Sequence, residues 1–277
     1  MTVCISGNRG SVINARAKGA VRLDVATLAA LSRKATSATF DAGQVDRNRS
    51  DVMTPDDICA NLDTVKSRIA KAATEADRKA ENISLIAVSK MFSADHIRPA
   101  LLAGHRLFGE NRVQEAAAKW PRLRDEYDGI ELHLIGPLQT NKAEEAVANF
   151  DVIQSVDRPK LAAKLAVAMD KLDKRPDCLV QVNTGEEEQK AGVSPQEVEA
   201  FVMQCREEFG LSVAGLMCIP PATDYPAPHF ALLHKFAQDL SLPVISMGMS
   251  SDYEMACQLG ATHIRVGSAI FGQRPPR

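Results

Sequence analysis

Ser84-Leu85-Ile86-Ala87-Val88-Ser89-Lys90 is the most informative segment of the chain, because it joins a run of apolar residues to a lysine at its C-terminal end. Such a run is typical of a strand buried on both faces of a parallel sheet. In a barrel of strand–helix units, side chains at the C-terminal ends of strands point into the ligand-binding mouth. An amine held there against apolar strands loses its proton more easily than a surface lysine and can attack an aldehyde. Lys90 is therefore the first candidate functional residue; the alternative is a solvated lysine that merely ends the strand.

Seven further segments of the same kind follow, and helical patterns separate them. The predicted strands are Ser84–Lys90, Arg106–Gly109, Glu131–Gly136, Val152–Val156, Cys178–Asn183, Val213–Ile219, Val244–Gly248 and His263–Gly267. The predicted helices are Thr54–Ala80, Asp95–Ala103, Arg112–Arg124, Asn141–Asn149, Pro159–Leu172, Pro195–Phe209, Pro228–Leu240 and Asp252–Leu259. Strands that alternate with helices pair in parallel, since a parallel crossover needs a helix-length connection. Eight strands favour an α/β fold of the closed (β/α)8 TIM barrel type over a doubly wound open sheet, and no Gly-rich dinucleotide-binding turn follows the first strand.

Local signals mark where several of these helices begin and end. Ser194 to Glu197 and Ser251 to Glu254 both have the pattern of a capping box. Gly104 and Gly260 stand where helix C-caps are expected. Thr54, followed by proline and two aspartates, predicts the start of the first helix of the barrel domain.

Composition excludes several functional classes. The chain has 277 residues and a formal net charge of -2, which gives no electrostatic reason to expect nucleic acid as a partner. No apolar stretch is long enough to span a bilayer, so no membrane association is expected. The six cysteines are scattered, which predicts buried thiols in a reducing cytoplasm. Neither cysteines nor histidines show metal-ligand spacing, and no metal is predicted.

The first 52 residues differ from the rest, being basic and rich in Ala, Ser, Arg, Gly and Asn. They lack the compact apolar region of a secretory signal peptide. We expect residues 1–52 to be a disordered extension or the product of a start codon assigned too far upstream, with an organellar targeting peptide as the alternative. Residues 53–277 are predicted to form a single barrel domain, because no linker divides them.

The loops after the seventh and eighth predicted strands are candidates for phosphate binding, since barrels frequently bind phosphate there. Ser250 and Ser251 precede a predicted helix, whose free N–H groups favour an anion. Gly267 allows the backbone to approach a ligand closely, and Ser268 offers an N–H and a hydroxyl. The alternative is that these serines are only helix caps.

Arg265 lies within the eighth predicted strand, where a guanidinium needs an anion, an acceptor or a ring nitrogen as partner. A structural ion pair is the alternative. A strand-end lysine, a phosphate cup and a buried arginine together suit pyridoxal 5'-phosphate, which has an aldehyde, a phosphate and a pyridine nitrogen. Lys90 would bind the aldehyde as a Schiff base, Ser250, Gly267 and Ser268 the phosphate, and Arg265 the pyridine nitrogen.

Several separated motifs carry a family resemblance: Ile86–Lys90, Phe108–Asn111, His133–Lys142, Gln181–Asn183, Gly215–Met217, Ser246–Asp252 and Arg265–Gly272. Together they resemble the pyridoxal-phosphate homeostasis protein family (YggS/PROSC-type), which has the barrel of the alanine racemase N-terminal domain. The resemblance covers residues 53–274. It implies the same ligand and the same roles for Lys90, Ser250, Gly267, Ser268 and Arg265, and it adds Asn111 as a residue that lines the ring.

The resemblance implies a protein that controls free pyridoxal phosphate by storing, shielding or delivering it, without catalytic turnover. The rival is a pyridoxal-phosphate-dependent amino-acid racemase, which needs a second base. None of the three tyrosines, Tyr127, Tyr225 and Tyr253, is clearly placed for that role. A third alternative is a class I aldolase with Lys90 as its amine. We expect a cytoplasmic monomer, with apoenzymes that require the cofactor as candidate recipients.

Overall fold

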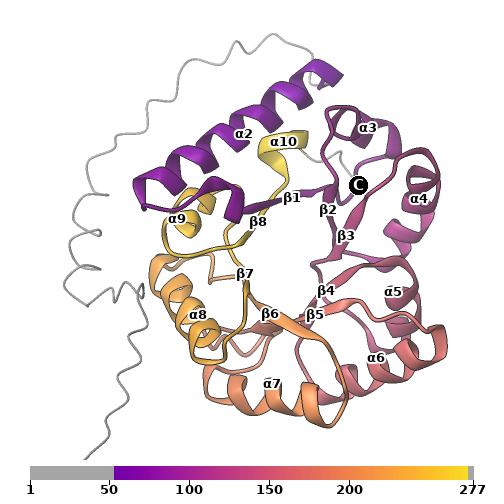
Figure 1. Cartoon of the computed structure of the whole chain (residues 1–277), viewed down its shortest axis with the longest axis vertical. Coiled ribbons are helices and arrows are strands. Elements are labelled where there is room, and N and C mark those ends of the chain that lie inside the picture. Colours follow the sequence, from indigo (N-terminus) through magenta and orange to yellow (C-terminus); the bar gives the residue numbers. More distant parts are fainter. Residues whose placement is uncertain (1–52, 274–277) are drawn as a thin grey trace, which may run out of the picture. The chain divides into compact units, whose positions relative to one another are not determined.

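The computed structural model describes residues Met53–Gln273, and eight parallel strands there close into a barrel in the order in which they occur along the chain (Figure 1). The strands are β1 Ser84–Val88, β2 Leu107–Glu110, β3 Glu131–Leu134, β4 Val152–Val156, β5 Asp177–Val182, β6 Val213–Cys218, β7 Val244–Ser246 and β8 His263–Val266. Pairing of β1 with β8 closes the barrel, with Ser84 opposite His263 and Ile86 opposite Arg265. The predicted (β/α)8 architecture is confirmed, whereas the predictions for residues 1–52 and 274–277 lie outside the described residues.

Helices surround the barrel on its outside (Figure 1). They are α2 Pro55–Glu75, α3 Ala94–Leu102, α4 Val113–Glu126, α5 Ala143–Asn149, α6 Pro159–Leu172, α7 Val198–Glu207, α8 Ala227–Asp239, α9 Tyr253–Gln258 and α10 Ser268–Phe271. Three short 3-10 turns are η2 Ala80–Asn82, η3 Thr140–Lys142 and η4 Pro195–Glu197. All eight predicted helices are present. α10 was not predicted, because four residues are too few to show a helical period.

Most of the predicted helix signals are correct. The Thr54 hydroxyl and the Asp57 carboxylate form a reciprocal capping box at α2, and Ser194 and Glu197 form another at η4. Gly104 and Gly260 follow α3 and α9 with φ of +83° and +103°, a conformation that glycine adopts without strain.

The predicted capping box at Ser251 is wrong. Helix α9 begins at Tyr253, with Asp252 as its N-cap, and the Asp252 carboxylate instead accepts a hydrogen bond of 2.6 Å from the Met249 N–H. α2 also ends at Glu75, five residues before the predicted end at Ala80, because the chain turns at Asp77 with φ of +54°.

Two kinds of core hold the barrel together. The main core lies between the strands and the helices and includes Phe108, Trp120 and Phe230, all nearly or fully buried. Two smaller apolar clusters are separate from it; their buried members are Ile86, Val88 and Ile135 in one, and Val152, Leu179 and Met217 in the other. Strand alternation places these smaller clusters inside the barrel.

The cysteines within residues 53–273 are all free thiols, and four of the five are buried. Burial raises the pKa of both the Cys205 and the Cys218 thiol to about 12, so these groups stay protonated and unreactive. No helix of the described part is long and apolar enough to cross a membrane. The same part contains no group of three or more His, Cys, Asp or Glu side chains that could hold a metal ion.

Candidate functional site

Five of the six predicted site residues follow the C-terminal ends of four neighbouring strands, whereas Arg265 lies within β8. In the closed barrel β7 pairs with β8, β8 with β1, and β1 with β2. Lys90 follows β1, Asn111 follows β2, Ser250 follows β7, and Gly267 and Ser268 follow β8. Residues that are up to 178 positions apart in sequence (Lys90 and Ser268) therefore meet along one sector of the barrel mouth.

The two predicted phosphate loops touch each other. The Gly267 N–H lies 3.4 Å from Ser250 Oγ, and the Arg265 N–H donates to the Gly248 carbonyl oxygen at 3.0 Å. Gly248 has φ of +89°, and a Cβ there would lie 2.5 Å from Ala256 Cβ, so both conformation and space require glycine. A Cβ on Gly267 would lie 3.2 Å from the Val88 carbonyl oxygen, which shows how closely β8 approaches β1.

Ser268 is exposed and begins α10, the short helix after β8. This helix is anchored at its C-terminal end. The Asn61 amide donates to the Ile270 carbonyl oxygen at 3.2 Å, and His96 Nε2 lies 3.0 Å from the Phe271 carbonyl oxygen. Hydrogen bonds to α2 and α3 therefore hold the segment that begins at Ser268, in addition to the few hydrogen bonds within its four-residue helix.

Lys90 is half-buried and lies two residues beyond the end of β1. Ile86 and Val88, at alternate positions of β1, belong to a cluster inside the barrel, and Lys90 lies in the turn that directly follows this strand. Asn111 is half-buried after β2. A Cβ on Gly136 would lie 2.3 Å from the Asn111 carbonyl oxygen, so this glycine lets the loop after β3 pack directly on the Asn111 backbone.

The Arg265 side chain is only 3% exposed and lies inside the barrel. Its Nη1 donates to Ser246 Oγ at 2.7 Å, and its Nη2 donates to the Cys218 carbonyl oxygen at 2.8 Å. Burial lowers the pKa of the guanidinium. The two acceptors that the structure provides for the Arg265 guanidinium are therefore neutral, and neither is the carboxylate of a structural ion pair.

A hydrogen-bonded chain continues from Ser246 across the barrel interior. Ser246 Oγ donates to Gln154 Oε1 at 2.6 Å, Gln154 Nε2 lies 2.6 Å from His133 Nδ1, and His133 Nε2 lies 2.7 Å from Glu131 Oε1. The donors run in one direction from the arginine to the carboxylate when His133 carries its proton on Nε2. These partners of Arg265 were not predicted from the sequence. Gln154 and Ser246 are nevertheless polar residues within predicted buried strands, which indicates that they need hydrogen-bond partners inside the barrel.

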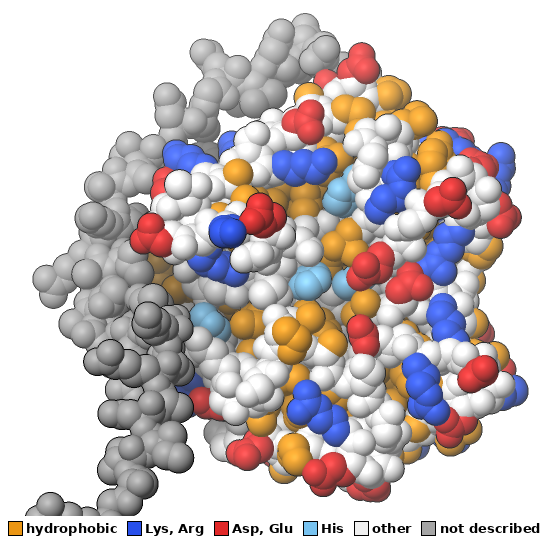
Figure 2. Space-filling view, in the orientation of Figure 1, with side chains coloured by type: hydrophobic (Ala, Val, Ile, Leu, Met, Phe, Trp, Pro, Cys, Tyr) orange, Lys and Arg blue, Asp and Glu red, His pale blue; other side chains and the backbone are white. Residues whose placement is uncertain are grey.

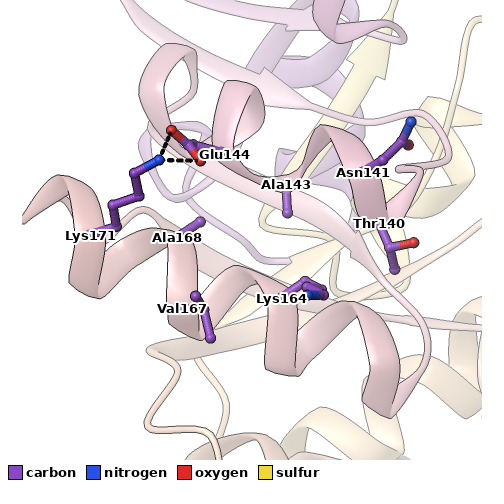
Figure 3. Close-up of a pocket in the computed structure, with 8 residues that line it drawn as sticks. All are labelled: Thr140, Asn141, Ala143, Glu144, Lys164, Val167, Ala168 and Lys171. Carbon is purple, nitrogen blue, oxygen red and sulfur yellow. Dashed lines mark hydrogen bonds and ion pairs between the residues drawn. The ribbon is translucent and has the colours of Figure 1, made fainter.

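A separate pocket of about 390 Å3 lies on the outer layer of the molecule (Figure 3). Its lining residues come from η3, α5 and α6: Thr140, Asn141, Ala143, Glu144, Lys164, Val167, Ala168 and Lys171. Lys171 Nζ donates to both carboxylate oxygens of Glu144 at its edge, at 2.7 and 2.9 Å. None of the predicted site residues lines this pocket. Figure 2 shows acidic and basic side chains interspersed over the face in view, without a continuous patch of one sign.

Comparison with known proteins agrees with this geometry. The family profile of the alanine racemase N-terminal domain matches residues 60–275. The pyridoxal phosphate homeostasis protein of Aquifex aeolicus is 37% identical over 225 residues, which cover 78% of this chain and 98% of the relative. PipY of Synechococcus elongatus, solved with pyridoxal phosphate bound, is 38% identical with a TM-score of 0.68, covering 78% of this chain and all of PipY.

The fold and the site therefore define a barrel of the alanine racemase N-terminal domain class. Within that class, the chain belongs to the pyridoxal phosphate homeostasis protein family. Alanine racemase of Clostridium difficile is a more distant structural neighbour, at 15% identity and a TM-score of 0.60. This chain covers only 58% of that enzyme, so the likeness extends to the fold alone.

Proposed function

We propose that this protein binds pyridoxal 5'-phosphate through a Schiff base with Lys90, and that it stores, shields and delivers the cofactor. The observation that carries the proposal is the meeting of two loops, where Ser250 Oγ and the Gly267 N–H approach to 3.4 Å beside the strand that holds Arg265. Lys90 follows the strand paired with that one. The cofactor, when bound, supplies an aldehyde carbon that accepts an amine.

The residues at the mouth fit this ligand by the chemistry of their donors. Hydroxyls of Ser250 and Ser268 and the N–H of Gly267 suit the oxygens of a phosphate. Arg265, a buried donor held by neutral acceptors, suits the pyridine nitrogen, which is an acceptor when it carries no proton. Asn111, on the opposite side of Lys90 from these loops, is proposed to line the ring.

Absence of turnover is the second part of the proposal. A cation beside the pyridine nitrogen keeps that nitrogen unprotonated, which weakens the cofactor as an electron sink. A racemase compensates with a base on each face of its substrate. Tyr253 is buried in the main core, Tyr225 is 53% exposed in a loop, and Tyr127 packs against the main core at the end of α4. These positions support a carrier over the racemase alternative.

The test of the binding proposal is borohydride reduction of the protein mixed with pyridoxal phosphate, followed by digestion and mass spectrometry. A pyridoxyl adduct on the peptide that contains Lys90 is expected, together with loss of the visible absorption band in Lys90→Ala. An adduct on another lysine, such as Lys142, would contradict the assignment. Production of D-alanine or D-serine from the L-enantiomer, well above the rate with free cofactor, would replace the carrier by a racemase.

The proposal extends to the assembly. We expect residues 53–277 to bind the cofactor without residues 1–52, in line with the family match at residues 60–275. A cytoplasmic monomer that passes its cofactor to apoenzymes completes the proposal. Light scattering of the pure protein, and reactivation of a pyridoxal-phosphate-dependent apoenzyme by the loaded protein, test these two points.

A further inference from the structure

The segment that carries Lys90 leaves β1 in an unusual backbone conformation. Met91, the next residue, has φ of +67°, in the left-handed region that residues with a side chain rarely adopt. A residue in that region persists only when its surroundings hold it there. The contacts around residues 89–92 therefore determine the backbone position from which the Lys90 side chain extends.

Lys119 on helix α4 holds this segment from outside the barrel. Its ammonium group donates to the carbonyl oxygens of Ser89 and Phe92, both at 2.9 Å, and these two residues bracket Lys90 and Met91. The third contact of Lys119 Nζ is Glu110 Oε1, at 2.8 Å. An ammonium group has three N–H donors, so these partners account for all of them.

Glu110 supplies the balancing charge. Its side chain is fully buried, and Oε1 also accepts hydrogen bonds from Ser89 Oγ at 2.6 Å and from Trp120 Nε1 at 3.1 Å. A buried carboxylate and a buried ammonium stabilise each other, and removing one partner leaves the other without compensation. A second acid, Glu115 on α4, accepts a hydrogen bond from the Met91 N–H at 3.3 Å.

We propose that Lys119, paired with Glu110, is a positioning residue for Lys90. The pair fixes the backbone on both sides of Lys90, so that the amine is delivered to the barrel mouth in one orientation. This inference rests on the proposed Schiff base at Lys90. It assigns to α4, which contributes no predicted ligand contact, the task of pre-organising the covalent link.

The test compares two ligands on the full-length protein. Pyridoxal phosphate needs Lys90 for its link, whereas pyridoxamine 5'-phosphate has an amine in place of the aldehyde and cannot form the link. In Lys119→Met, apparent affinity for pyridoxal phosphate and the rate of adduct formation on Lys90 should fall about tenfold or more, because a small misplacement of a reacting group has effects of that size. Affinity for pyridoxamine phosphate should stay unchanged.

Lys119→Met leaves the buried Glu110 without its cationic partner, and this variant can fail to fold for that reason. In that case the same two ligands are compared on the double variant Lys119→Met/Glu110→Gln, which removes both charges. Lys171→Met is the matched control, since Lys171 also bonds a glutamate but is 62% exposed on α6. Equal losses for both ligands, or no loss for either, would overturn the positioning role. Wild-type protein without an adduct on Lys90 would overturn the proposed function itself, and the role of Lys119 with it.

Discussion

The two halves of the barrel mouth are held in different ways. The half that carries Lys90, after β1, is fixed from outside the barrel by a buried ion pair between Lys119 and Glu110. The half that carries the proposed phosphate loops, after β7 and β8, is fixed by close backbone approach and by hydrogen bonds from Arg265 to neutral acceptors, which continue into the barrel interior. A covalent link depends on the position of one atom, whereas a phosphate is recognised by the shape of a loop. The first task suits a charged pair at one point, and the second suits glycines and hydroxyls.

Replacing Lys90 tests the division between these halves most severely. Lys90→Ala should lose the covalent link completely, since no other amine is expected at that position, while affinity for pyridoxamine phosphate survives through the other half. Absorption spectra and calorimetric titration with the two ligands measure this. Loss of both ligands would mean that the two halves are not separable.

Crowding the phosphate loops should have the next largest effect. A side chain on Gly267 meets the Val88 backbone at 3.2 Å, so Gly267→Val must displace the end of β8 or of β1. Affinity for both ligands should fall by about a hundredfold, or roughly 2.7 kcal/mol. Ala200→Val, at an exposed position on α7, is the control and should bind both ligands normally. Unchanged affinity in Gly267→Val would show that ligand binding tolerates a larger separation between the ends of β8 and β1.

The interior hydrogen bonds of the β7–β8 half can be broken without touching the mouth. Gln154→Leu removes the partners of the Ser246 hydroxyl and of His133 Nδ1, leaving polar atoms buried and unpaired. We expect the free energy of unfolding to fall by about 2 kcal/mol. Urea denaturation measures this change, with Gln238→Leu at an exposed site on α8 as the control. A stability equal to wild type would indicate that another group satisfies these atoms.

The smallest expected effect is a pH dependence of stability, to which one histidine near each half contributes. Burial lowers the pKa of His105, before β2, to about 4, and burial followed by the charge of His133 lowers that of His263, in β8, to about 4. Each histidine therefore takes up a proton more readily when the chain unfolds. Its contribution to the free energy of unfolding is fully present above pH 6.5 and is lost as the pH falls toward 4. His105 alone should cost about 1 kcal/mol between pH 7.5 and 5.5. The difference in denaturation midpoint between these pH values should shrink in His105→Gln, and an unchanged difference would contradict this.

The position of the candidate residues at one barrel mouth could be predicted, because these residues adjoin strands that the sequence marks clearly. Lys90, Gly267 and Ser268 lie one or two residues beyond the ends of β1 and β8, and a parallel barrel gathers the C-terminal ends of all its strands at one mouth. The prediction of a helix cap failed where several nearby side chains could bond the same backbone N–H groups. Ser251 had the pattern of a capping residue, but α9 begins one residue later than that pattern predicts, with Asp252 as its N-cap and the Asp252 carboxylate accepting a hydrogen bond from the Met249 N–H.

The supporting residues were beyond reach of sequence patterns for a different reason. Gln154 and Ser246 are 92 positions apart, and Lys119 lies 30 positions from Ser89. Lys119 lies on an otherwise polar amphipathic helix, where a lysine usually indicates a solvated face. Only its ion pair with Glu110, at the end of β2, leaves no more than 11% of its side chain exposed.

Apolar periodicity and chain direction predict the order of strands and helices, the closure of eight strands and the residues that reach the mouth. Which polar groups hold those residues in place depends on the folded chain. Hydrogen bonds form between atoms brought together by the twist and register of the barrel, and register between distant segments is not written in any local pattern.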